Sequence, residues 1–217
     1  MKINKITPTE QSISFIIHLN NVCNFKCSYC IAWQQLSKEI LSLEQIEEII
    51  NTIKLLRKNW DNRHISIDIN WWEPTLHKNI IDIIKLFLEI DNLFLQVSTN
   101  LLRVSSLKDD FYKLDKINSN LFFNISYHYF EYSWKEEKFI ESLKVLINKS
   151  INFKVKFLLP DNNIELDEFY KTKTFILNET WINENNCKYD LIIHNNWDIS
   201  KSYSKSILDY FYNKRFN

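Results

Sequence analysis

Glycine is absent from this sequence, which is its most unusual feature. An average chain of this length contains about 15 glycines. This chain has none, together with a single alanine, Ala32, and three prolines. A genome rich in A and T lowers the glycine content of its proteins but does not remove glycine entirely. Some turns need a backbone with positive φ, which glycine adopts at the lowest cost. Other residues must therefore stand at turn positions where glycine is normal.

A charge excess and long apolar segments are absent as well. The 27 basic and 27 acidic residues cancel, so no net charge attracts nucleic acid or anionic lipid over a distance. No segment has about 18 consecutive apolar residues, and the first 12 residues lack the apolar centre of a signal peptide. These absences predict a cytoplasmic protein that binds neither nucleic acid nor membranes.

The residues that are present form alternating strand-like and helix-like segments in a chain of 217 residues, which suits one domain. We expect strands at 13–19, 64–69, 93–98, 121–127, 153–159 and 173–177. We expect helices at 79–90, 107–117, 135–148, 164–171 and 204–213, a further helix that starts at a Ser42–Gln45 capping box, and a hairpin at 190–200.

This order predicts an α/β fold with parallel strands and with helices on the outer face of the sheet. Six strand–helix units fit the length and eight do not, so we expect a partial, open six-fold β/α barrel. Residues 1–180 would form this core, and 181–217 a short C-terminal tail. In such sheets the site lies at the C-terminal ends of the strands.

Three of the four cysteines lie directly after the first expected strand. Cys23, Cys27 and Cys30 are spaced C-x3-C-x2-C. In a cytosolic chain this spacing favours metal or redox chemistry over disulfides. Three thiolates can hold three irons of a [4Fe–4S] cluster and leave one iron open, whereas the usual four thiolates close the cluster.

Zinc is the alternative for this loop, with His18 or His128 as a fourth ligand. Structural zinc loops usually contain a second C-x2-4-C pair farther along the chain. Only Cys187 is available for such a pair, so zinc fits the spacing less well than an iron–sulfur cluster.

The cysteine spacing, with Tyr29 before the last cysteine, resembles the radical S-adenosylmethionine (SAM) superfamily, and the resemblance runs over roughly residues 12–178. It implies a [4Fe–4S] cluster whose unique iron chelates the methionine part of SAM. It further implies reductive cleavage of SAM and hydrogen abstraction from a substrate by a 5′-deoxyadenosyl radical. An electron donor of the flavodoxin or ferredoxin type is implied as a partner.

The second motif is Trp71-Trp72-Glu73-Pro74, at the end of the second expected strand. Radical SAM enzymes commonly have Gly-Gly-Glu-Pro here, and the resemblance implies that this backbone binds the amino group of SAM. Glycine suits that task because no Cβ obstructs a close approach. Two tryptophans stand in place of the two glycines.

All seven tryptophans lie in polar or turn-like stretches where glycine is the natural residue. They are Trp33, Trp60, Trp71, Trp72, Trp134, Trp181 and Trp197. The codon UGA means stop, tryptophan or glycine in different genetic codes. One hypothesis is therefore that these positions are glycines written as tryptophan. The alternative is that the tryptophans are real, in loops or at an interface, and then two indoles crowd the methionine pocket.

Further candidates follow the third and fourth expected strands. The resemblance places Thr99 and Asn100 close to SAM and Ser126 at its ribose, although all three can also serve as strand-end caps or satisfy backbone groups. His128 and Glu131 are candidates to face the substrate. Since histidine titrates near neutrality, His128 could transfer a proton, whereas most loop histidines are merely solvated.

The expected function is therefore that of a radical SAM enzyme acting on a small molecule or a peptide. Cys187 opens a segment that faintly resembles an auxiliary-cluster extension, but no further cysteine follows, so we expect no complete auxiliary cluster. One alternative is an activase of a glycyl-radical enzyme. Another is a degenerate, non-catalytic cluster- or zinc-binding protein.

Overall fold

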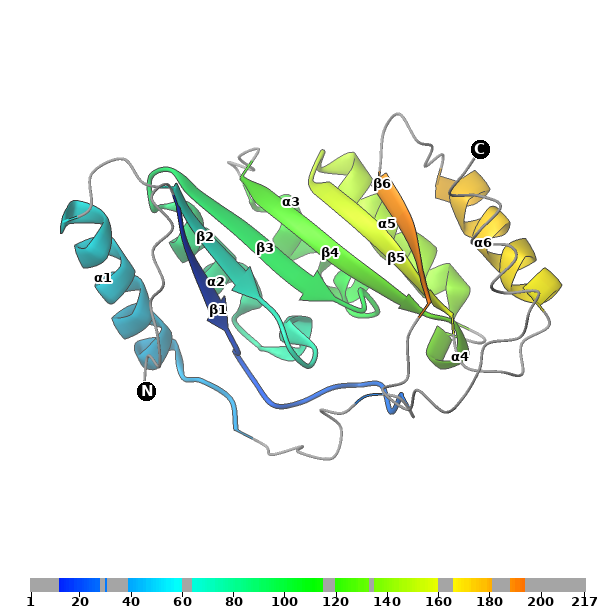
Figure 1. Cartoon of the computed structure of the whole chain (residues 1–217), viewed down its shortest axis with the longest axis horizontal. Helices are drawn as coiled ribbons and strands as arrows, with labels where there is room; N and C mark the ends of the chain where they lie inside the picture. The colour runs from blue at the N-terminus through cyan, green and yellow to red at the C-terminus, as the bar shows by residue number, and fades with distance from the viewer. Residues whose placement is uncertain are drawn as a thin grey trace.

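Parallel strands in chain order form one open sheet in the computed structural model (Figure 1). The structure describes residues 12–27, 30, 39–59, 64–114, 120–132, 135–159, 166–180 and 188–193. The strands are β1 (Ser12–Ile17), β2 (His64–Ile69), β3 (Leu93–Thr99), β4 (Leu121–His128), β5 (Asn152–Leu159) and β6 (Lys188–Ile193). Each strand pairs in parallel with the next. The predicted α/β fold, a partial six-fold β/α barrel, is confirmed.

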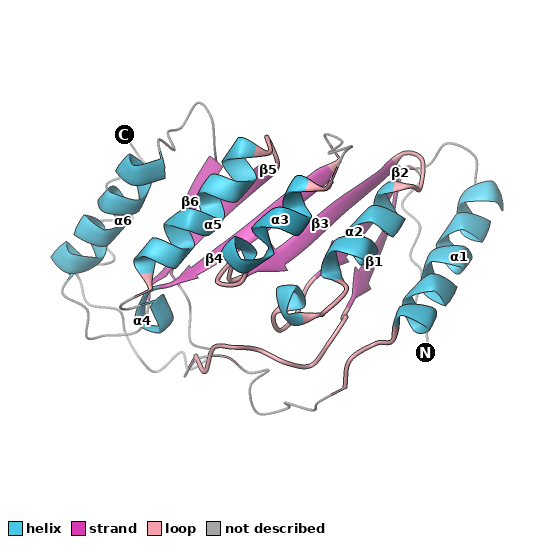
Figure 2. Cartoon of the chain, turned by 180° about the vertical axis from the view of Figure 1, so that it is seen from behind, coloured by secondary structure: helices cyan, strands magenta, loops and turns pink. Residues whose placement is uncertain are grey.

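Within the described part of the chain, helices cover one face of this sheet and leave the other face, called here the open face, uncovered. They are α1 (Leu43–Asn59), α2 (Ile80–Leu88), α3 (Lys108–Tyr112), α4 (Tyr129–Tyr132), α5 (Glu136–Asn148) and α6 (Leu166–Thr180). Short 3-10 turns η2 (Pro74–Leu76) and η3 (Val104–Leu107) lie between them. Helices α2, α3 and α5 lie behind the sheet in Figure 1 and in front of it in Figure 2.

The alternation of side chains along each strand separates an apolar face from a polar one. In β2, Ile65, Ile67 and Ile69 are buried in the core, while Ser66 and Asp68 are half-buried on the opposite face. Strands β3 and β4 repeat this pattern. Parallel sheets covered on both faces usually have nearly continuous apolar strands. The alternation here therefore indicates that the uncovered face works in contact with water or a polar ligand.

The helices begin and end for local reasons. The predicted capping box is present, since Ser42 N–H donates to Gln45 Oε1 at 2.8 Å and Gln45 N–H to Ser42 Oγ at 3.3 Å. Helix α5 ends in a Schellman motif, in which Ile151 N–H reaches Leu146 O and Ser150 N–H reaches Ile147 O. Ser150 has φ of 53° there. A serine thus occupies a position that glycine usually fills.

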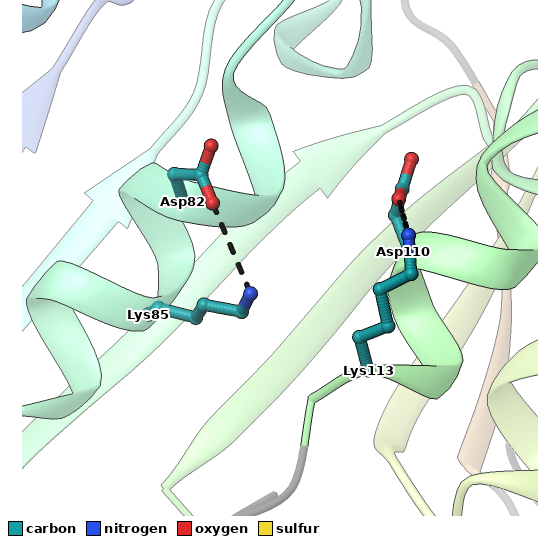
Figure 3. Close-up of polar contacts among 4 residues, drawn as sticks. All are labelled: Asp82, Lys85, Asp110 and Lys113. Carbon is teal, nitrogen blue, oxygen red and sulfur yellow. Dashed lines mark hydrogen bonds and ion pairs between the residues drawn. The ribbon is translucent and has the colours of Figure 1, made fainter.

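Exposed ion pairs lie on the surface of the helical layer. Lys85 lies 3.8 Å from Asp82 on α2, and Lys113 lies 2.9 Å from Asp110 at the end of α3 (Figure 3). Water screens such pairs, so they add little to stability. Within the described residues, no helix combines the length and apolarity needed to cross a membrane.

In the last third of the chain, the predicted strand at 173–177 is wrong. The expected helix at 164–171 and strand at 173–177 are one helix, α6. The Lys-Thr-Lys-Thr sequence at 171–174 has the period of two that is typical of a strand. The described residues that are buried, however, are Lys173, Ile176 and Thr180, which have helical spacing. Residues 190–193 of the expected hairpin at 190–200 lie in β6, which pairs in parallel with β5. Residues 194–200 and the expected helix at 204–213 lie outside the described part.

Candidate active site

The cysteine loop leaves the C-terminal end of β1 and lies beside the ends of β2, β3 and β4. Cys27 is buried, Cys23 and Cys30 are half-buried, and all three thiols pack against the apolar core. Phe25 N–H donates to Cys23 Sγ at 3.4 Å, and Cys30 N–H to Cys27 O at 3.0 Å. Tyr29 lies outside the described residues.

The three thiols suit a cluster as donors. Burial raises the pKa of Cys23 to about 11, and the nearby Glu73 and Cys30 contribute. Metal binding must therefore displace a proton from this sulfur. Among the residues described, no three His, Cys, Asp or Glu side chains surround one point closely enough for a single metal ion. A [4Fe–4S] cluster would not require the three cysteines to surround one point, because each thiolate would bind a different iron.

Glu73 connects the cysteine loop with two strand ends. The Glu73 side chain is fully buried. Its Oε1 accepts hydrogen bonds from Thr75 N–H (3.0 Å), Thr75 Oγ1 (2.6 Å) and Thr99 Oγ1 (2.6 Å), and its Oε2 accepts one from Asn100 N–H (2.7 Å). Burial raises the pKa of this carboxyl, and these hydrogen bonds oppose the rise. All four partners donate, so they satisfy the ionised form.

The backbone of Glu73 completes this connection. Its N–H donates to Val22 O at 3.0 Å, and its carbonyl accepts from the Asn20 amide at 3.1 Å. Pro74 follows as the first residue of η2. Asn20 is not among the residues predicted from the sequence, where its only signal is a polar side chain directly after an apolar strand. Asn20 is buried, so its hydrogen bond to Glu73 O joins the two segments inside the protein.

Thr99 and Asn100 are buried and occupied by contacts within the protein. Besides its bond to Glu73, Thr99 Oγ1 accepts Leu101 N–H at 2.8 Å. The Asn100 amide donates to Asn24 Oδ1 in the cysteine loop at 2.7 Å. Tyr132 donates its hydroxyl proton to Asn100 O. The two residues thus hold the end of β3 against the cysteine loop.

Trp71 and Trp72 have left-handed backbones, with φ of 68° and 56°. A bulky residue rarely adopts such φ values, and each costs about 1–2 kcal/mol. Trp71 is 50% exposed and stacks on His18, with ring centroids 5.3 Å apart. Leu101, which follows Thr99-Asn100, also has positive φ, at 66°. Since Leu101 is not a tryptophan, recoding of UGA does not account for it.

The other five tryptophans, Trp33, Trp60, Trp134, Trp181 and Trp197, lie outside the described residues, as does Cys187.

A hydrogen-bonded polar row crosses the open face near these strand ends. The Asn124 amide donates to Ser98 Oγ at 3.4 Å, Ser98 Oγ to Asp68 Oδ1 at 3.3 Å, and the Asn70 amide to Asp68 Oδ2 at 2.7 Å. Asn70 Oδ1 is buried beside Trp71 and has no hydrogen-bond partner in the part of the chain that the structure describes. An unsatisfied acceptor of this kind fits a ligand that brings a donor.

Ser126, His128 and Glu131 are half-buried at or beyond the end of β4. Ser126 lies on the open face, where its register partner on β5 is Lys156. The His128 imidazole lies against the cysteine loop, with Nδ1 3.4 Å from Cys27 Sγ. Glu131 lies in α4, one turn beyond the strand.

Comparison with curated proteins gives two relatives of the same name. A probable GTP 3′,8-cyclase of Thermoplasma volcanium is 31% identical over 112 residues, which are 50% of this chain and 32% of that protein. A GTP 3′,8-cyclase of Alkaliphilus metalliredigens is 30% identical over 81 residues, 35% of this chain and 23% of that one. The chain therefore spans less than a third of the length of either relative.

Solved structures share the fold at low sequence identity. Streptococcus suis SuiB bound to its precursor peptide SuiA has a TM-score of 0.59 and 13% identity, with 94% of this chain and 47% of that chain covered. The anSMEcpe structure with bound AdoMet has a TM-score of 0.63 and 14% identity, with 95% and 61% covered.

The family comparison covers the cysteine loop, Glu73 and most of the parallel sheet. The profile of the Radical SAM superfamily matches residues 17–170, which is more than half of the chain. The stretch contains all three clustered cysteines and the C-terminal ends of β1 to β5. Members of this family use SAM and an iron–sulfur cluster. This chain belongs to the radical SAM superfamily.

Proposed function

We propose that this chain is an enzyme that holds a [4Fe–4S] cluster through Cys23, Cys27 and Cys30, cleaves SAM reductively, and abstracts hydrogen from a substrate. When bound, the cluster supplies the one electron that splits SAM into methionine and a 5′-deoxyadenosyl radical, which takes a hydrogen atom from the substrate. A flavodoxin- or ferredoxin-type partner would deliver that electron.

The observation that carries this proposal is the set of contacts around Glu73. Glu73 belongs to the Trp71–Pro74 segment and joins two others to it. Its backbone N–H donates to Val22 O in the cysteine loop, and its carboxylate accepts from Thr99 and Asn100 at the end of β3. Groups that must meet one ligand have to be held rigidly relative to one another. The contacts support a shared site in which the cluster and SAM are adjacent.

The methionine end of SAM would lie against residues 71–74. The backbone there is left-handed at Trp71 and Trp72, which turns peptide groups in directions that ordinary strand residues do not present. Asn70 Oδ1 is a buried acceptor without a partner in the described residues. We propose that this acceptor and the adjacent backbone receive the amino group of SAM.

Ser126 is our candidate for the SAM ribose, because it is half-buried on the open face. We assign Thr99 and Asn100 a supporting role instead, since their side chains are engaged with Glu73 and Asn24. Glu131, also half-buried, remains a candidate on the substrate side.

A polar substrate fits the open face best. The row of Asp68, Ser98 and Asn124 offers hydrogen-bonding groups, and the register places Lys154 beside Asn124. Neighbours of this chain include a structure with a bound precursor peptide and relatives named for GTP. We propose a peptide or a polar small molecule as the class of substrate.

A second candidate function is a cluster-binding protein that does not cleave SAM. The tryptophans favour it, because Trp71 and Trp72 stand in the segment where the methionine part of SAM would bind. The two functions differ in SAM turnover, not in cluster content.

The test is anaerobic reconstitution of the whole chain with iron and sulfide, followed by addition of SAM and dithionite. About four irons per chain with matching sulfide, together with release of 5′-deoxyadenosine and methionine, would support the enzyme. A full cluster without any SAM cleavage would support the second candidate. Failure to bind iron and sulfide would overturn both.

Cysteine variants provide the matched control for this test. Changing Cys23, Cys27 or Cys30 to Ala removes one of the three proposed thiolate ligands, so each variant should lose the cluster. Cys187→Ala should keep it, because the tail contributes no ligand to the proposed cluster. A stable cluster in Cys27→Ala would contradict the assignment of the ligands.

A further inference from the structure

His128 ends β4 and touches a cysteine 101 positions away in sequence. Its Nδ1 lies 3.4 Å from Cys27 Sγ, within the range of a hydrogen bond to sulfur. The cysteine loop supplies a second contact with the same ring. Phe25 meets the imidazole edge-on, with centroids 5.6 Å apart and an interplanar angle of 75°. The ring is therefore placed by two different residues of the loop.

Phe25 is itself fixed in position. It is buried and packs edge-on against Tyr132, with centroids 5.2 Å apart. Tyr132 in turn donates to Asn100 O at the end of β3. Because Phe25 lies between Cys23 and Cys27 in sequence, these contacts hold the middle of the cysteine loop against the ends of β3 and β4. The short distance between His128 and Cys27 thus follows from packing.

The chemistry of a metal-bound thiolate determines the direction of this contact. A thiolate has no proton and can only accept a hydrogen bond. When Cys27 is a ligand, the contact is favourable only if the imidazole presents an Nδ1–H group to the sulfur. A hydrogen bond to a cluster sulfur stabilises the more negative, reduced state more strongly, and hydrogen bonds to the sulfurs are among the factors that set the potential of such clusters.

We propose that His128 is a positioning residue that donates an Nδ1–H···S hydrogen bond to the Cys27 thiolate and raises the reduction potential of the cluster. This inference rests on the proposed function, because it requires the cluster. It assigns His128 to the electron-transfer step, whereas the sequence makes it a candidate for proton transfer to the substrate. The donor partner reduces the cluster more easily when this hydrogen bond is present.

Redox potentiometry of the reconstituted chain without SAM tests the inference. Cluster content is measured first, by iron and sulfide analysis, and the reduced cluster is then followed by its electron paramagnetic resonance signal. His128→Phe keeps a ring of similar shape but removes the N–H, so its potential should shift to a more negative value. His128→Asn restores an N–H near the position of Nδ1, so its potential should return toward that of the unaltered chain.

His18→Phe is the matched control. His18 also lies at the strand ends but stacks on Trp71, so the potential of the cluster should stay unchanged. A full cluster with the same potential in His128→Phe as in the unaltered chain would overturn the inference and leave the proposed function standing. An unaltered chain that binds no iron and sulfide would overturn both.

A measurement on the unaltered chain removes the dependence on any variant's folding. Histidine labelled with ¹⁵N should give a nitrogen coupling to the reduced cluster in pulsed paramagnetic resonance, transmitted through the hydrogen bond. The His18→Phe protein should retain the coupling. The absence of this nitrogen coupling from an unaltered chain with a full cluster would also overturn the inference. A pure proton-transfer role would slow substrate turnover without moving the potential or producing the coupling.

Discussion

Thr99 at the end of β3 donates a 2.6 Å hydrogen bond to the buried carboxylate of Glu73, which follows β2. Neighbouring parallel strands place these two residues side by side, although 26 positions separate them. Since Glu73 also reaches the cysteine loop through Val22, this bond links the three segments on which the proposed chemistry depends.

Replacing Glu73 with Gln should destabilise the fold by about 1–3 kcal/mol, the cost of an unsatisfied buried group. The Gln side chain keeps one acceptor for the three donors at Oε1, but its NH2 group then meets Asn100 N–H, which is also a donor. Urea unfolding measures the difference. Glu47→Gln on the exposed side of α1 is the matched control and should change little. Equal stability of the two variants would contradict the prediction.

The pH dependence of stability should contain a contribution from Glu73. Burial raises the pKa of this carboxyl above its ordinary value of 4.5. The folded chain then binds more protons than the unfolded chain between the two pKa values, so the free energy of unfolding falls as pH rises through that window.

Subtracting the Glu73→Gln curve isolates this contribution, because the variant cannot titrate there. The difference in unfolding free energy between the unaltered chain and the variant should decline from pH 4.5 upward and become level above the folded pKa. A difference that grows with pH would mean that hydrogen bonds lower this pKa more than burial raises it.

Replacing Trp71 and Trp72 together with Gly should increase the affinity for SAM. Glycine changes the stability of the folded chain, and not the affinity, by removing the cost of two left-handed residues, about 1–2 kcal/mol each, and losing about 0.4–1 kcal/mol each to the unfolded chain. It also clears two indoles from the proposed methionine pocket. The double Ala variant is the control, because it removes the indoles but keeps the strained φ. Calorimetric titration of the reconstituted proteins compares the three.

The codons of the gene decide the origin of these tryptophans. If glycine is the natural residue, positions 33, 60, 71, 72, 134, 181 and 197 are encoded by UGA. The mass of the protein from its natural source would then be lower than the printed sequence requires. UGG at these positions would establish tryptophan, and Trp71 and Trp72 would be genuine left-handed tryptophans.

Ser150→Gly should stabilise the protein by about 0.5–1 kcal/mol. Ser150 holds φ of 53° in the Schellman motif after α5. Glycine relieves about 1–2 kcal/mol of left-handed cost and loses somewhat less to the greater freedom of the unfolded chain. Thermal unfolding measures the gain. Asn148→Gly, at the last residue of α5, has no such strain to relieve and should destabilise.

Local patterns in the sequence were sufficient for most of the sheet and helices. The strand at 64–69 and the capping box at Ser42 and Gln45 agree with the structure. The reason is that a strand period of two, a helix period of 3.6 and a cap depend on neighbouring residues alone. Where the local pattern was ambiguous, as in the Lys-Thr alternation of α6, burial against the core selected the helix.

The tertiary structure decided the contacts among residues that are distant in sequence. The motif identifies Glu73, but only the adjacency of β2, β3 and the cysteine loop makes it a buried acceptor for Thr99 and Asn100. The sequence offered both His18 and His128 as possible partners of the cysteine loop. Only the packing of β4 against a loop 101 positions earlier brings His128, and not His18, to Cys27. The sequence by itself therefore determined the family, the first five strands and the cysteine motif. Strand order and side-chain packing determined which polar groups support the site.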